Sequence, residues 1–281
     1  MIVGCGEWGF RDLPLADHFE IAARLGFRTL EFGIGGGQTG RLPEQPGPQD
    51  IDHLRSLADR FQIRTPFCCI ENDFTLPDAA AHAEMVAKVL DQLEVAADCE
   101  ATHVRLFAGF TPAEEMTESI WQRMTDAFEI SQAACADLGL QIAIETHGAI
   151  TFGPDGSARH RHTVSTDPAS LKRLIDELPL EVGFNYDPGN LKAVNPMDRT
   201  CQLDLLNSRT NYCHLKDWNP SGEGWVACAI GDDDLDYRPI LQGMDFNGVY
   251  LIEYEPVGDV EAGIQRSLAY LRDVVSEVRF E

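Results

Sequence analysis

Short runs of aliphatic and β-branched residues recur along the chain, each bounded by glycine, proline or other turn-forming residues. Runs of about four to eight such residues are typical of strands buried in a sheet. The pattern predicts strands at residues 2–6, 29–34, 64–70, 102–107, 141–146, 181–186, 211–216 and 249–254.

Between these runs, apolar residues recur at spacings of three and four, which is the stripe of an amphipathic helix. The stripe is clearest in residues 79–99, AAAHAEMVAKVLDQLEVAADC. Ser165, Thr166 and Asp167 suit the N-terminal cap of the fifth helix. Helices are predicted at residues 15–25, 48–61, 78–98, 113–138, 167–178, 200–208, 236–243 and 259–277.

Strands and helices thus alternate eight times, an order that predicts parallel strands joined by right-handed crossovers. Eight units in this length match an α/β fold of the (β/α)₈ TIM-barrel type, and no linker divides the chain. We therefore predict a single domain over residues 1–281. An open, doubly wound sheet would need a G-x-G-x-x-G turn that opens a helix. GIGGG at 33–37 lacks that spacing, so we interpret it as a flexible loop at the wall of the site.

The longest segments without periodicity, residues 147–165 and 217–235, follow the fifth and seventh strands. In a TIM barrel these positions are loops of the catalytic face, and long loops there suggest a lid or a specificity surface. His160 and His162 are expected to face solvent or to belong to the lid. The acidic run GDDDLDY (231–237) does not match an EF-hand loop, and we interpret it as a solvated turn before a helix.

The charge balance limits the classes of partner. The 281 residues include 46 acidic and 22 basic ones, a formal net charge of −24 that repels nucleic acid and anionic lipid surfaces. We expect neither nucleic acid nor a membrane as a partner, since no run approaches the roughly 18 apolar residues of a membrane span.

The cysteines and the N-terminus bear on location. Eight cysteines occur without a C-x-x-C pair, mostly inside strand-like or helix-like runs, which favours free thiols in a reducing compartment. The first residues, MIVGCGEWGFRD, lack the basic and apolar regions of a signal peptide. We expect a cytoplasmic protein.

Polar residues stand at the ends of the last four strand-like runs. They are Glu145 in QIAIETH, Asp187 in EVGFNYDPGN, His214 in NYCHLKDW and Glu253 in VYLIEYEP. A buried carboxylate needs a partner, and a single one at a strand end is usually a cap or half of an ion pair. In a barrel, however, inward side chains at the ends of successive strands converge. Because three carboxylates and an imidazole can bind one divalent cation, the sequence predicts metal-assisted chemistry.

The segments IETHG, NYDPGN, CHLKD and LIEYE resemble those of the xylose isomerase-like TIM-barrel superfamily, over essentially the whole chain. The resemblance implies one divalent ion held by Glu145, Asp187, His214 and Glu253, with Glu255 as the competitor for the last place. Mn²⁺ is the first choice, with Mg²⁺, Co²⁺ and Zn²⁺ as alternatives.

The chain departs from two branches of that superfamily. The related abasic-site endonucleases hold three zinc ions with additional histidines. Here Asn190 replaces the histidine of a D-x-x-H motif, and no D-x-H follows the seventh strand. Ketose 3-epimerases also tend to carry a histidine at the position of Asn190, so a close match to either branch is not expected.

The resemblance implies an isomerase or epimerase that acts on a sugar or keto-sugar through a metal-stabilised enediolate. Metal-bound Glu145 and Glu253 would remove and return the proton beside the carbonyl. His147 is a further candidate base, since imidazole titrates near neutral pH, or it orients Glu145. Lys216 either places a cation near a developing oxyanion or forms a buried ion pair with Glu145 or Asp217.

Four residues are candidates for binding the substrate: Glu31, Arg105, Asn190 and Trp225. Glu31 could hydrogen-bond sugar hydroxyls or pair with Arg105, which could itself bind an anionic group or form a structural salt bridge. Trp225, with Trp8 and Phe110, could form an apolar wall for a sugar ring, although aromatic residues on such loops are more often packing residues.

Two other functions stay open. A lyase of the same fold would use the same enolate to expel a leaving group from a keto-sugar, a keto-inositol or a 3-keto-glycoside. The E-x-H arrangement of Glu145 and His147 suits it, because elimination benefits from a separate base. The other alternative is a non-catalytic protein that binds a metal and a sugar. Homo-oligomers are frequent among similar barrels, and that analogy leaves the assembly open.

Overall fold

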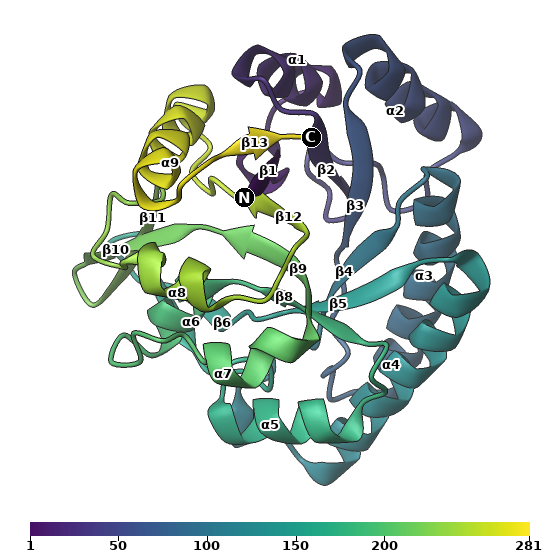
Figure 1. Ribbon diagram of the computed structural model, residues 1–281. Coiled ribbons are helices and arrows are strands. Elements are labelled where there is room, and N and C mark those ends of the chain that lie inside the picture. The colour runs from purple at the N-terminus through teal and green to yellow at the C-terminus, as the bar shows by residue number, and fades with distance from the viewer.

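The computed structural model covers residues 1–281 and shows eight parallel strands closed into a barrel (Figure 1). The last strand pairs with both its predecessor and the first strand, which closes the ring. The prediction of a (β/α)₈ TIM barrel is confirmed. In order around the ring the strands are β1 (Ile2–Cys5), β2 (Thr29–Ile34), β3 (Arg64–Ile70), β4 (His103–Phe107), β5 (Gln141–Glu145), β8 (Gly183–Tyr186), β9 (Thr210–Leu215) and β12 (Val249–Ile252).

Helices form an outer ring around the strands (Figure 1). Their boundaries follow the predicted ones closely, and the Asp167 side chain caps the fifth by accepting the N–H of Ser170. None of the helices is both long and apolar enough to cross a membrane. The α-helices are α1 (Leu15–Leu25), α2 (Pro48–Phe61), α3 (Ala79–Asp98), α4 (Glu118–Leu138), α5 (Pro168–Glu177), α6 (Pro188–Val194), α7 (Leu203–Leu206), α8 (Tyr237–Gly243) and α9 (Val260–Val274).

Two helical segments differ from the prediction. The stretch expected as a helix at 200–208 contains only α7 and the 3₁₀ turn η3 (Asn207–Arg209). Helix α6 was not predicted, because its seven residues are too short to show a periodic stripe. The other 3₁₀ turns are η1 (Trp8–Phe10) and η2 (Ala113–Glu115).

The glycine-rich GIGGG segment ends β2 and continues as a loop, as expected, but none of its residues lines the cavity at the barrel mouth. Gly35, Gly36 and Gly37 have φ angles of +77°, +80° and +76°, a left-handed conformation that favours glycine. The next helix, α2, begins only at Pro48. The segment therefore does not form the turn of a nucleotide-binding fold.

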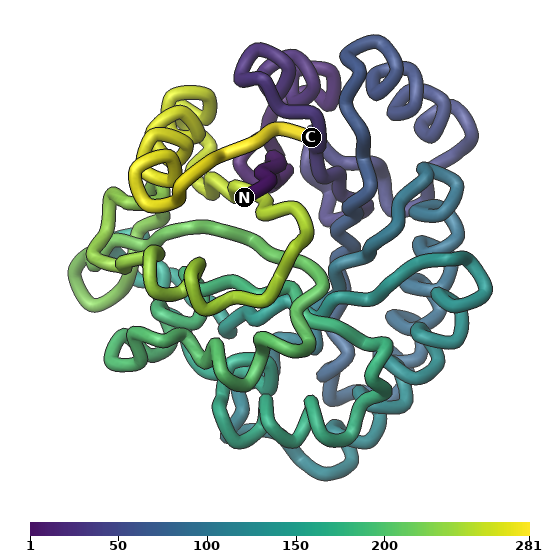
Figure 2. Tube along the Cα trace, in the orientation of Figure 1, coloured from purple at the N-terminus to yellow at the C-terminus, as the bar shows by residue number.

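The chain ends beside its beginning (Figure 2). The short strand β13 (Arg279–Phe280) pairs with β1, and the N–H of Arg279 donates to the carbonyl of Met1 at 2.9 Å. The Thr29 hydroxyl of β2 donates to the carbonyl of Glu281. β1 and β2 pair with each other only through Cys5 and Leu30. The strand β13 therefore joins β1 and β2 at the lower end of the barrel, below that pair.

The two long segments after the fifth and seventh strands contain β-hairpins. The first hairpin is β6 (Ala149–Phe152) with β7 (Ala158–Arg161), and the second is β10 (Asp217–Ser221) with β11 (Gly224–Cys228). They join through Trp225 and Ala158 into one four-stranded sheet, which we name the lid sheet. The sequence did not predict these strands, because their side chains alternate too little in polarity to give a signal.

Inside the barrel, an apolar layer supports a polar one. Phe67, Ala143, Tyr212 and Leu251 form a buried cluster in the barrel interior. Because alternate residues of a strand face the same side, the residue two positions further along each strand also points inward. Those residues are Cys69, Glu145, His214 and Glu253. The inward-facing residues of these strands therefore form an apolar layer in the barrel interior and a polar layer at the barrel mouth.

Candidate metal centre and substrate cavity

Four side chains from four successive strand ends meet at this mouth. The nearest ligand atoms of Glu145, Asp187, His214 and Glu253 all lie within 4.8 Å of one another, and all four residues are buried. The structure therefore brings together the residues that the sequence offered as ligands. Three carboxylates and one imidazole at this spacing suit a single divalent cation.

The NYDPGN segment positions Asp187 at the start of α6. Its Oδ1 accepts the N–H of Asn190 at 3.0 Å, while Oδ2 is buried and accepts no hydrogen bond. A Cβ atom at Gly189 would collide with the backbone carbonyl of Lys216, so only glycine allows α6 to pack this closely against the end of β9. One oxygen of Asp187 is thus fixed by the helix and the other is free for a cation.

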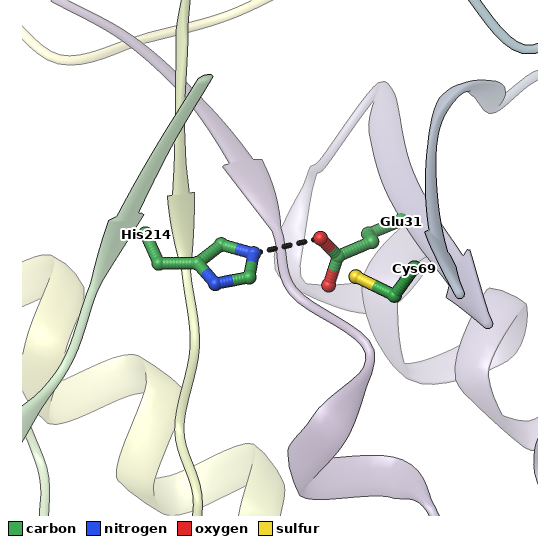
Figure 3. Close-up of side chains that lie close together, drawn as sticks. All are labelled: Glu31, Cys69 and His214. Carbon is green, nitrogen blue, oxygen red and sulfur yellow. Dashed lines mark hydrogen bonds and ion pairs between the residues drawn. The ribbon is translucent and has the colours of Figure 1, made fainter. Parts of the chain in front are cut away.

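His214 is oriented by Glu31, as Figure 3 shows. Its Nε2 lies 2.7 Å from Oε1 of Glu31, which also accepts from the hydroxyl of Tyr212. Because a carboxylate accepts, Nε2 carries a proton. Nδ1 lies 3.0 Å from the amide nitrogen of Asn185, and 3.5 and 3.9 Å from the nearest oxygens of Glu253 and Glu145. A carboxylate behind a histidine in this way fixes the ring and its tautomer for metal binding.

Glu31 therefore lies behind the histidine and does not line the cavity at the barrel mouth. Burial opposes its ionised form, but His214 and Tyr212 lower the pKa of Glu31 to about 2. Cys69 lies beside it (Figure 3). Burial raises the pKa of the Cys69 thiol to about 12, so the thiol carries its proton when no cation is bound beside it.

The ammonium group of Lys216 lies among the carboxylates. Its Nζ is 2.5 Å from Oε2 of Glu253, 3.2 Å from Glu255, 3.4 Å from Oδ2 of Asp187 and 3.9 Å from Glu145. Burial raises the pKa of Asp187 to about 8. The ammonium of Lys216 opposes this increase, and the negative charges of Glu253 and Glu145 add to it. The cluster is short of positive charge even with the lysine present, and its donor set therefore fits a divalent ion.

Arg105 fixes the other side of Glu145. Its Nε lies 3.1 Å from Oε2 of Glu145, and NH2 lies 3.3 Å from Glu71. Glu71 in turn pairs with Arg41 at 2.7 Å, which pairs with Glu7 at 3.2 Å. Burial alone would raise the pKa of Glu145, but Arg105, His214 and Lys216 together outweigh it and hold that pKa well below the usual range. Glu145 is thus kept ionised, as a ligand requires, and is a poor proton acceptor.

Sequence reasoning missed Arg41, Glu7 and Glu71 in this chain of charges. Arg41 follows the glycine-rich loop, and no spacing or run marks it as a partner of residues on other strands. The Arg105 side chain does line the cavity, but its guanidinium is paired with carboxylates, as the salt-bridge alternative expected.

Asn190 and Trp225 do not line the cavity. The Asn190 amide is buried beside the cluster, where it donates to Glu145 at 3.2 Å and accepts from the indole of Trp218 at 3.3 Å. The ring of Trp225 covers the ammonium of Lys192 at 4.9 Å, on the side of the lid sheet that packs against α6. Trp8 and Phe110, the other two aromatic candidates, do border the cavity.

The cavity above the cluster has a volume of about 230 Å³. His147 borders it and packs edge-on against Phe107 and Phe110, with ring centroids 5.1 and 5.7 Å apart. Its Nδ1 lies 2.7 Å from the carbonyl of Gly148, which only accepts, so the neutral ring has a free lone pair on Nε2. Burial lowers the pKa of His147, which favours that neutral form. The lining residues are Trp8, Glu71, Arg105, Phe107, Phe110, Glu145, His147, Ile150, Phe152, Lys216, Glu253 and Glu255.

The expectations for the long segments hold in part. His160 belongs to the lid sheet, as one alternative expected, and it does not face solvent: both ring nitrogens are buried without hydrogen bonds, its ring lies 4.7 Å from that of Trp218, and burial lowers its pKa to about 3. The acidic run is not wholly solvated, because Asp233 is buried and forms an ion pair with Lys192. Asp236 does cap the helix α8 that follows.

Comparisons with known proteins agree with this architecture. A family model described as xylose isomerase-like TIM barrel matches residues 19–274. Similar solved structures include a D-tagatose 3-epimerase-like protein (19% identity, 98% of each chain, TM-score 0.73) and the IolI protein with a bound zinc atom (16%, 98% of each, 0.74). The probable 3-DHS dehydratase AsbF from Bacillus anthracis is also similar (15%, 97% of this chain and 99% of that one, 0.74). No curated protein matches the chain.

We expect Glu145→Gln and His214→Ala each to abolish metal retention, because each removes a ligand from a buried cluster that needs all its charge. Elemental analysis after gel filtration of protein purified with Mn²⁺ measures the retained equivalents. The matched control is Glu255→Gln, which changes a carboxylate of the same cavity that lies outside the ligand group. If both ligand variants keep one equivalent, the ligand assignment is wrong.

Replacing Lys216 with methionine is expected to strengthen Mn²⁺ binding, because the lysine and the ion neutralise the same carboxylates. Without metal, the variant should be less stable by about 3–5 kcal/mol, the usual cost of leaving a buried charge unpaired. Thermal unfolding with and without Mn²⁺ measures both effects, and Lys172→Met, at an exposed pair with Asp176, is the control. An unchanged response to Mn²⁺ would show that lysine and metal do not compete.

Proposed function

The chain belongs to the xylose isomerase-like TIM-barrel family, and on that basis we propose that it is a divalent-metal-dependent isomerase or epimerase of a sugar or keto-sugar. The observation that carries the proposal is the buried Glu145, Asp187, His214 and Glu253 cluster at the floor of a sugar-sized cavity, with His147 on its wall. A divalent ion bound there would polarise a carbonyl oxygen of the substrate and stabilise the negative charge that develops on deprotonation.

His147 is the proposed base. Its free Nε2 lone pair belongs to a ring that lines the cavity, and it is not among the four clustered ligand residues. Glu145 is a poor alternative, because its salt bridge with Arg105 stabilises the ionised form. One base on one face can move a proton between neighbouring carbons, as an aldose–ketose isomerisation requires. Inversion at a carbon needs a second group on the opposite face, and Glu253 is the remaining candidate.

A lyase is the second candidate function, and the position of His147 supports it. In elimination, the base takes the proton beside the carbonyl, the C–H electrons form the enolate, and the enolate expels the substituent on the next carbon with its bonding pair. A base separate from the metal ligands suits that sequence. Structures that share this fold include both an epimerase-like protein and a probable dehydratase.

Mn²⁺ is the ion we propose, since carboxylate-rich sites with one imidazole suit it, with Mg²⁺, Co²⁺ and Zn²⁺ as alternatives. We also propose a cytoplasmic location. All eight cysteines are free thiols, and seven of them are buried, which supports a reducing compartment.

With Mn²⁺-loaded protein and a panel of sugars and keto-sugars in D₂O, we expect deuterium to enter the carbon next to the carbonyl. His147→Gln should slow this exchange by roughly 10²–10⁴-fold, the usual contribution of a positioned base, without loss of bound metal. Proton NMR follows the exchange and identifies the product, an isomer for the first function and an eliminated group for the second. The exposed His53 on α2 supplies the control variant, His53→Gln.

Normal exchange by the His147 variant would refute the assignment of the base alone. Metal-loaded wild-type protein that binds sugars but exchanges no carbon-bound hydrogen in any of them would contradict the proposed function. That result would favour the non-catalytic alternative.

A further inference from the structure

The cavity has two chemically different sides. Glu145 and Glu253 of the cluster and the other charged side chains line one part of it. Trp8, Phe107, Phe110, Ile150 and Phe152 give it an apolar lining, which we name the apolar rim. Phe107 and Phe110 lie with ring centroids 4.8 Å apart, so part of the rim is a continuous aromatic surface. A free sugar or a sugar phosphate offers hydroxyls and charge and has no large apolar surface to match such a rim.

Phe152 is the most exposed member of that rim. It is 75% exposed although it lines the cavity, and it lies at the end of β6 in the lid sheet. An apolar side chain of this size left in water at the entrance of a binding site gains free energy when a ligand covers it.

The charged side chains of the cavity offer no free cation for a phosphate group. The lining contains one arginine, Arg105, and one lysine, Lys216, and both are paired with carboxylates. Four carboxylates share the lining with them: Glu71, Glu145, Glu253 and Glu255. A phosphate group would lie beside these carboxylates and would find no unpaired lysine or arginine in the lining.

A second depression adjoins the cavity along Phe110, His147 and Ile150, which border both. It has a volume of about 400 Å³ and is more open to solvent. Arg161, the one arginine or lysine in its lining, pairs with Glu114 and Glu115 at 2.7 Å each. The inner cavity, about 230 Å³, is smaller than the roughly 300–1,000 Å³ of most ligand sites, so a ligand larger than one sugar ring would extend toward this depression.

We propose that the substrate carries an uncharged aromatic substituent on its sugar, in place of a phosphate. The sugar unit lies in the inner cavity, and the substituent packs against Phe110, Ile150 and Phe152 toward the second depression. The inference rests on the proposed function for the role of the inner cavity, but it adds a binding surface for the rest of the substrate. It makes the lid sheet a determinant of substrate choice.

Pairs of phenyl and methyl β-glycosides of glucose, galactose and xylose test the proposal without turnover. Isothermal titration of the Mn²⁺-loaded full chain should show at least one phenyl glycoside binding about tenfold more tightly than its methyl counterpart. Phe152→Ser should reduce that preference several-fold and leave binding of the methyl glycoside unchanged. Leu180→Ser, at a residue that is 81% exposed and precedes β8 at the lower end of the barrel, is the control.

The absence of a phenyl preference in all three pairs, or a preference that Phe152→Ser leaves intact, overturns the proposal. So does glucose 6-phosphate binding more tightly than every phenyl glycoside. A dimer that dissociates in Phe152→Ser, with no phenyl preference, would assign the exposed ring to a subunit contact. Phenyl preference without hydrogen exchange in any substrate would contradict the proposed function alone, and exchange without the preference would contradict this inference alone.

Discussion

Carboxylates are costly to bury unless positive charge accompanies them, and this cost governs the arrangement of the barrel mouth. Glu7, Glu31, Glu145, Asp187 and Glu253 are all buried there. The buried cations that face them are Arg41, Arg105 and Lys216, together with the imidazole of His214. The acids outnumber the permanent cations, so the site favours any additional cation that its oxygens can reach.

The buried carboxylates differ in the cation that lies beside them, and therefore in how strongly their ionised form is stabilised. Arg105 is bound to Glu145 and keeps it ionised, and His214 does the same for Glu31. Asp187 receives less compensation, and its pKa is raised accordingly. Lys216 contacts Asp187 and Glu253, which have no arginine partner. A metal ion bound by these two carboxylates would therefore compete with Lys216 and leave the arginine pairs in place.

Much of the fold could be predicted from the sequence, because buried strands leave long aliphatic runs and the outer helices leave an apolar stripe. The convergence of Glu145, Asp187, His214 and Glu253 followed from the same alternation, since strand ends of a barrel must meet. The lid sheet could not be predicted, because β6 and β7 have four residues each and their pairing depends on contacts between distant loops. The hydrogen-bond and ion-pair partners of Glu31, Arg105 and Asn190 could not be predicted either. A sequence shows which residues face inward, but it does not show which polar groups lie within contact distance.

The most direct measurement is diffraction at the manganese absorption edge from crystals grown with Mn²⁺. The account predicts one anomalous peak about 2.0–2.4 Å from an oxygen of Glu145, Asp187 and Glu253 and from Nδ1 of His214, with the Lys216 ammonium moved away from Glu253. The account is contradicted if crystals of protein that carries a full equivalent of Mn²⁺ show no peak among these four side chains. It is also contradicted if Lys216 remains between Asp187 and Glu253 in those crystals.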